Sequence, residues 1–132
     1  MRKQYHSRLT SRGNLIWDVH RLVALSAGLP RIRVALADIR EFDEPFWFGG
    51  PDDVATCRAV ADHASLIQAT DLAYPIILSS DGRVMDGMHR VAKAHMLGLK
   101  EIEAVRFDRD PEPDYVDVPD DQLPYEESHE GV

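Results

Sequence analysis

Residues 74–107 read YPIILSSDGRVMDGMHRVAKAHMLGLKEIEAVRF, and this stretch carries the clearest fold information in the chain. Its apolar runs and turn residues alternate on a short scale, which is typical of small strands and helices packed together. The predicted elements are a strand at 75–78, a turn at 79–82, a strand at 83–86, a helix at 87–97 and a strand at 102–107. The Asp-Gly pair in the turn is a strong hairpin signal, and Gly98 stands where helices commonly end.

Three further elements are predicted upstream of this stretch. Asn14 is a plausible N-cap for a helix over Leu15–Ala27, and Gly28 ends it. Alternating apolar residues predict a strand at 32–36, and a second long helix is expected over Asp52–Thr70. The apolar stripe predicted for that helix consists of Cys57, Val60, Ala61, Ala64 and Ile67. The predicted fold class is therefore α/β (α+β), a small mixed sheet packed by about three helices.

Charge divides the 132-residue chain into two parts. Residues 108–132 hold ten acidic residues and one basic residue, whereas residues 1–107 are close to neutral. We therefore expect one domain over 1–107, with an N-terminal helical extension, followed by an acidic, Pro-rich tail over 108–132. Two interpretations of the tail stay open. It is a disordered acidic segment, or its interspersed apolar residues anchor it along the domain.

Composition excludes several classes of protein. Cys57 is the only cysteine, so an intramolecular disulfide and a Cys-rich zinc site are excluded, and a reducing compartment is favoured. No apolar run approaches the roughly 18 residues that span a bilayer, and no signal-peptide segment follows the basic start. We expect a cytoplasmic protein with no membrane partner.

The junction between the strand at 83–86 and the helix at 87–97 carries the most chemistry. A helix N-terminus attracts anions through its free amides, and Gly87 lets a phosphate approach the backbone closely. Arg90 adds a fork of donors, and His89 can donate or titrate near neutral pH. Asp86 could cap the helix, hold a metal ion or orient a nucleophile. The plain alternatives are that Asp86 is only a cap and that His89 is a solvated surface residue.

The loop at 37–50, ADIREFDEPFWFGG, is the second candidate region. Glu41 and Glu44 are candidate general bases that would take a proton from an acceptor hydroxyl. Which acid faces a pocket cannot be derived from the loop sequence. Trp47 could stack on a base or close a pocket, whereas Phe46 and Phe48 are expected to be core residues.

The stretch PIILSSDGRV followed by MDGMHRVAKAHMLGLKEIEAVRF resembles the core of the ParB/sulfiredoxin superfamily, to which the label "ParB-like nuclease" domain is often attached. The shared pattern is an apolar strand, an Asp-Gly turn, a strand ending in D/N-G-x-H/R-R, an Ala-rich helix, Leu-Gly and a closing strand. The match covers about 33 residues closely, and the strand at 32–36 resembles the entry strand of the superfamily more loosely. It implies a ParB/sulfiredoxin-like fold with a nucleotide site.

The resemblance implies roles for individual residues. Gly87, Met88, His89 and Arg90 would bind nucleotide phosphate, with Trp47 beside them. Asp86 matches the acid of the free-serine kinases, whose motif DGHHR is similar to the DGMHR found here. The implied catalytic set is Asp86, His89, Glu41 and Glu44, with Asp86 also a ligand of Mg²⁺. Sulfiredoxin chemistry is not expected, because Met88 stands where sulfiredoxins carry their cysteine, and no metal cluster for DNA hydrolysis is visible.

Two function hypotheses follow. The first is a nucleotide-dependent phosphotransferase or NTPase that uses ATP or CTP with Mg²⁺, with a small hydroxyl-bearing molecule as a conceivable acceptor. The alternative is a non-catalytic nucleotide-sensing or DNA-associated accessory module. DNA is the weaker partner because the acidic tail would compete for any basic surface. The oligomeric state cannot be derived from the sequence.

Overall fold

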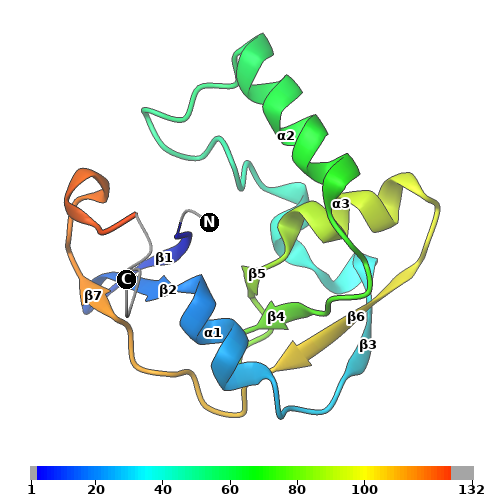
Figure 1. Ribbon diagram of the computed structural model, residues 1–132, viewed down its shortest axis with the longest axis horizontal. Helices are drawn as coiled ribbons and strands as arrows, with labels where there is room; N and C mark the ends of the chain where they lie inside the picture. The colour runs from blue at the N-terminus through cyan, green and yellow to red at the C-terminus, as the bar shows by residue number, and fades with distance from the viewer. Residues whose placement is uncertain (1–2, 126–132) are drawn as a thin grey trace, which may run out of the picture.

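The computed structural model describes residues 3–125 and shows a mixed α+β protein with two small sheets and three α-helices (Figure 1). One sheet has the strand order β1-β2-β7, with β1 at Tyr5–Thr10, β2 at Gly13–Asp18 and β7 at Tyr115–Val116. The other has the order β3-β6-β4-β5, with β3 at Ile32–Ala35, β6 at Glu101–Arg106, β4 at Ile76–Leu78 and β5 at Val84–Asp86. The α-helices are α1 (Val19–Ser26), α2 (Cys57–Ala69) and α3 (Met88–Met96). Three short 3-10 helices are η1 (Leu36–Asp38), η2 (Arg40–Asp43) and η3 (Asp120–Gln122).

The unit predicted from the central stretch is confirmed at the level of its elements. β4 pairs antiparallel with β5 and parallel with β6, so the four-stranded sheet is mixed, as expected. α3 begins one residue after the predicted start, because Gly87 occupies the N-cap, and Gly98 follows its end with a positive φ of 77°. The short strands and the glycine-marked helix ends explain why local pattern was sufficient here.

Three strands of the four-stranded sheet, β4, β5 and β6, place buried residues on both of its faces. On one face lie Ile76, Leu78, Val84, Ile102 and Ala104, packed against α3 and the 36–39 segment. On the other lie Ile77, Met85, Val105 and Phe107, packed against residues of β2 and α1. Because side chains alternate along a strand, β4 contributes to both cores, and its three residues are all buried.

The predicted helix over Leu15–Ala27 is wrong in its first part. Residues 13–18 form β2, which pairs with β1 on one side and β7 on the other, and α1 begins only at Val19. Asp18, not Asn14, is the N-cap, and its Oδ1 accepts the His20 amide at 2.9 Å. Leu15, Ile16 and Trp17 are consecutive and all buried, which a strand between two neighbours permits and a one-faced helix does not.

The second helix is shorter than predicted, and its apolar stripe does not form the core. α2 begins at Cys57 with Thr56 as its N-cap, and none of its 13 residues is buried. Cys57 and Val60 are exposed, so the expectation that Cys57 lies on a core face is wrong. α2 projects from the body and reaches it mainly through α3 (Figure 1). No helix among residues 3–125 has the length and apolarity to cross a membrane.

The described part of the acidic segment, residues 108–125, packs on the body. β7 pairs with β2, Leu123 is 5% exposed, and the Pro111 carbonyl accepts the Trp17 indole N–H at 2.8 Å. Asp114 and Asp117 accept the backbone amides of Asp18 and Asn14 at 2.8 and 2.7 Å. Of the two interpretations of the tail, the anchored one holds for these residues. Residues 126–132 lie outside the described part.

Candidate functional site

The turn from β5 into α3 requires glycine at position 87. Gly87 has a φ of 111°, a left-handed conformation that side-chain-bearing residues rarely adopt. A Cβ there would also lie 2.6 Å from Cγ2 of Ile76, which is fully buried in β4. Gly87 provides no side-chain cap, and the first turn of α3 holds no acidic residue. The start of α3 therefore presents backbone amides that no side chain caps.

Asp86 and Arg90 form an ion pair beside this helix end. The Arg90 Nη2 donates to Asp86 Oδ2 at 3.0 Å and to the Pro75 carbonyl oxygen at 3.2 Å. The side chains are 15% and 21% exposed, for Arg90 and Asp86 respectively. The Nε of Arg90 is buried and has no hydrogen-bond partner among the described residues. The Nε of Arg90 is thus an unused donor, whereas its terminal nitrogen Nη2 already donates to Asp86 and Pro75.

The Asp86–Arg90 pair borders a cavity of about 310 Å³ between α1 and the four-stranded sheet. The remaining walls are largely apolar. They are formed by Val23, Ser26, Ala27, Leu29, Arg31, Tyr74, Pro75, Ile77 and Val105. A mostly apolar cavity with a few convergent polar groups is the usual form of a small-molecule site. We call it the Arg90 cavity.

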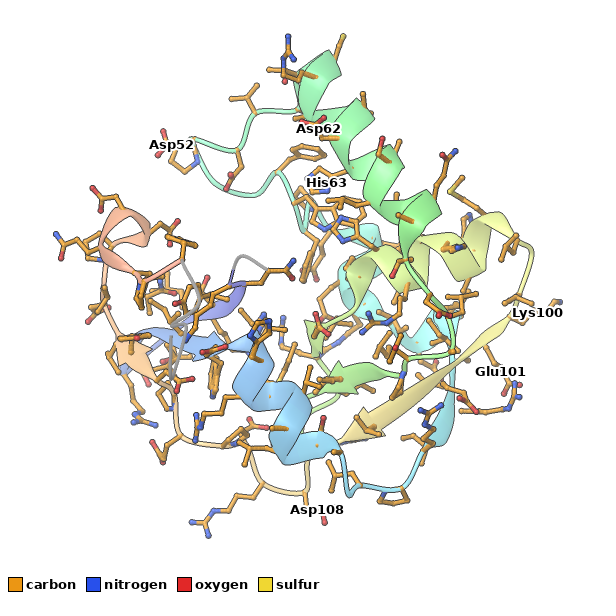
Figure 2. All side chains as sticks on the ribbon, viewed as in Figure 1. Asp52, Asp62, His63, Lys100, Glu101 and Asp108 are labelled. Carbon is orange, nitrogen blue, oxygen red and sulfur yellow. The ribbon has the colours of Figure 1, made fainter. Side chains whose placement is uncertain are left out.

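His89 points away from the Arg90 cavity and toward α2. Its Nε2 lies 2.9 Å from Nδ1 of His63, and the two rings are within 22° of parallel. The Trp47 ring stacks on both, with centroid distances of 4.5 Å to His63 and 4.6 Å to His89. Figure 2 shows His63 on α2 above the ring side chains of the body. We call these three residues the histidine cluster.

Burial is the main cause that lowers the pKa of His89 below its usual value, and the neighbouring His63 lowers it further. Asp86 acts in the opposite direction without overcoming these effects. A hydrogen bond between two imidazoles needs an N–H donor on one ring and a lone pair on the other. If both rings were cations, no lone pair would be left to accept this bond. The neutral form of His89 is thus favoured, and a neutral imidazole can accept a proton.

The structure places Glu41 and Glu44 elsewhere. Glu41 is 4% exposed, and its Oε2 accepts the Val84 amide at 2.5 Å. Both acids line a second cavity, on the side of the sheet that meets β1, whereas Asp86 lines the Arg90 cavity. The two loop acids and Asp86 therefore do not share either of these cavities. Met88 is 4% exposed in the core, so only its backbone is available to a ligand.

Among residues 3–125, no group of three or more His, Cys, Asp and Glu side chains is arranged to hold a metal ion. Mg²⁺ in nucleotide sites usually takes only one or two carboxylates, and ligand phosphates complete its coordination. Asp86 fits that limited role, because its Oδ1 accepts no hydrogen bond from the described residues while Oδ2 holds Arg90.

His63 is the residue that sequence reasoning missed. It lies on the α2 face formed by Ala59, His63 and Ile67, the partly buried face. The residues of that face are less apolar than the stripe predicted from the sequence, with which the face shares only Ile67. Only the packing of α2 on α3 brings His63 to His89, so no local pattern could have identified the pair.

The chain matches no family model, no curated protein and no solved structure in the three comparisons made.

Proposed function

We propose that this chain binds a nucleotide in the Arg90 cavity, with phosphate groups at the start of α3. The observation that carries the proposal is the Arg90 guanidinium at the wall of the cavity, beside a helix N-terminus that lacks a side-chain cap. Its Nη1 donates to no described residue, and guanidinium groups form strong charge-assisted hydrogen bonds with phosphate oxygens. The DGMHR resemblance supports the same assignment.

The apolar walls of the cavity suit the organic part of such a ligand. Leu29, Ile77 and Val105 line it at the end of α1 and on the sheet. A flat base is held mainly by dispersion and burial, whereas its phosphates need charge. Tyr74, 64% exposed at the rim, offers a ring on which a base could stack.

The chemistry proposed for the site is phosphoryl transfer or nucleotide hydrolysis with ATP or CTP and Mg²⁺. The ion would be held by Asp86 and the ligand phosphates, and it would supply charge stabilisation. The resemblance gives His89 the role of proton acceptor, but its Nε2 faces His63 and not the Arg90 cavity, so His89 is left out of the proposed chemistry. A small hydroxyl-bearing molecule, or water, would be the acceptor.

The test of binding is a calorimetric titration with ATP, ADP, CTP and GTP, with and without Mg²⁺. Arg90→Ala is expected to weaken the preferred nucleotide by about 1.5–3 kcal/mol, the range of charge-assisted hydrogen bonds. Arg58→Ala is the matched control, because Arg58 is an exposed arginine on α2. Equal affinities of Arg90→Ala and Arg58→Ala would contradict the proposal, as would the absence of binding by any of the four nucleotides.

A second candidate function is nucleotide binding without turnover. It is favoured by the placement of Glu41 and Glu44 in a different cavity from Asp86 and by the existing Asp86–Arg90 ion pair. A DNA-associated role has less support. The described acidic segment already pairs with basic residues of the body, through Glu112 with Arg12 and Asp114 with Arg21.

Asp86→Asn separates the two candidates. Asparagine keeps an oxygen for Arg90 and removes the charge, so the fold and the nucleotide affinity measured without Mg²⁺ should change little. If the chain is an enzyme, turnover should fall by about 100-fold or more, as when one charge-stabilising group is removed from an active site. Product analysis with each nucleotide measures this. Turnover that persists unchanged in Asp86→Asn would assign Asp86 a structural role only.

A further inference from the structure

The cavity that contains the loop acids is a site in its own right. It measures about 370 Å³ and lies where β1, η2 and β5 meet. Its lining residues are Tyr5, His6, Ser7, Arg8, Glu41, Glu44, Phe46, Arg83 and Val84. None of these residues lines the Arg90 cavity. We call it the Glu41 cavity.

Glu41 is the unusual group in this cavity. Only 4% of its surface is exposed, yet it makes no ion pair with any described residue. The amide of Val84 occupies Oε2, and no described donor reaches Oε1. A buried carboxylate without a cation is costly, because desolvation is not offset by an opposite charge. Glu41 thus lines a cavity with room for a ligand, and one of its carboxylate oxygens has no described donor.

The two arginines that line the cavity are directed toward other groups. The Arg8 Nη2 donates to Ser79 Oγ at 3.1 Å, and its Nη1 lies 3.8 Å from Asp81 Oδ1. The Nε of Arg83 lies 3.8 Å from the other oxygen of Asp81. Asp81 is therefore the nearest acid to both arginines, and its single charge offsets one of their two. Glu41 and Glu44 have no ion-pair partner among the described residues, so the two arginines and three carboxylates leave one negative charge in excess at this cavity.

Aromatic side chains complete the walls. Phe46 is 40% exposed, and Tyr5 lines the same cavity from β1. Aromatic faces attract organic cations, and carboxylates accept hydrogen bonds from ammonium groups. We propose that the Glu41 cavity binds a small organic cation, an alkylammonium group held by Glu41 and Glu44 with its carbon chain against Phe46 and Tyr5.

The test uses the ¹⁵N-labelled full chain and three probes of similar size. These are butylammonium, its neutral counterpart 1-butanol and the anion butyrate. The Val84 amide is the reporter, because it donates to Glu41. We expect butylammonium to shift this resonance saturably, and the other two probes to leave it unchanged. No saturation by butylammonium, or an equal response to butyrate or butanol, would overturn the proposal.

Glu44→Gln is the principal variant, because Glu44 is exposed and its replacement does not threaten the fold. Loss of one charge-assisted hydrogen bond should weaken butylammonium binding by about tenfold or more. Asp43→Asn is the matched control, since it removes the same charge from the neighbouring position, at a residue that does not line the cavity. Equal weakening in both variants would mean a general electrostatic effect and no built site.

Glu41→Gln keeps an oxygen for the Val84 amide and tests the buried charge itself. It should abolish binding of butylammonium while the remaining amide resonances keep the dispersion of the folded chain. Arg90→Ala should leave butylammonium binding intact, so the two cavities can fail or succeed separately. Retained binding in a folded Glu41→Gln variant would contradict the assignment.

Discussion

Replacing Gly87 with alanine is expected to lower the free energy of unfolding by about 2–5 kcal/mol, through strain at a left-handed residue plus overpacking of a filled core. The φ of Gly87 is 111°, and the new Cβ would lie 2.6 Å from Ile76 Cγ2 and 2.9 Å from Arg90 Nη2. Ile76 is the first residue of the buried β4 and is itself fully buried, so it cannot retreat without disturbing the core that packs against α3. Urea unfolding followed by circular dichroism measures the change.

Gly82→Ala is the control for this prediction. Gly82 also has a positive φ, 85°, but a Cβ at this position would meet nothing within 4 Å, so only the backbone strain applies. We expect it to cost about 1–2 kcal/mol. The difference between the losses of unfolding free energy in the two variants measures the cost of placing a Cβ against Ile76. Equal losses would show that the packing around Gly87 is looser than described.

Acid is expected to destabilise the protein through His6. Burial lowers the pKa of His6 from 6.5 to about 4, and the nearby Arg8 cation acts in the same direction. Its ring stacks on Trp17, and its Nε2 is buried with no partner among the described residues. The unfolded chain therefore binds this proton first as the pH falls. The stabilisation is present above pH 6.5 and is lost as the pH falls toward 4.

The expected loss from His6 alone between about pH 7.5 and about pH 4 is about 3 kcal/mol. His6→Phe keeps a ring against Trp17 and removes the titration, so this variant should lose correspondingly less stability over the same range. Its unfolding free energy at each pH, from urea denaturation, gives the comparison. Because the pKa of His89 is also lowered, a smaller acid dependence of the same sign should persist in the variant. Identical pH profiles of the variant and the unmodified chain would contradict the assignment.

The two proposed sites are joined by one short strand. Val84, the first residue of β5, lines the Glu41 cavity and donates to Glu41, whereas Asp86, its last residue, lines the Arg90 cavity. Asp86 and the loop acids, which prompted one composite active site, therefore belong to two cavities, and His89 lines neither of them. The experiments on Arg90 and on Glu44 address them independently.

Local pattern was sufficient for the stretch from β4 to β6. Its strands are short apolar runs, and its turns and helix ends are marked by Gly82, Gly87 and Gly98, all with positive φ. Such signals act over a few residues, so they do not depend on the rest of the chain. The same reasoning located Arg90 and Asp86 at the start of α3, where they border a cavity.

Contacts between distant segments could not be derived in this way. Residues 15–17 were expected in a helix and are in β2, because pairing with β1 and with the far later β7 buries them. The separation of Glu41 from Asp86 and the meeting of His63 with His89 likewise depend on how loops and α2 pack. Periodicity and turn residues report the conformation of a segment, whereas its neighbours are chosen by the burial and hydrogen bonding of the whole chain.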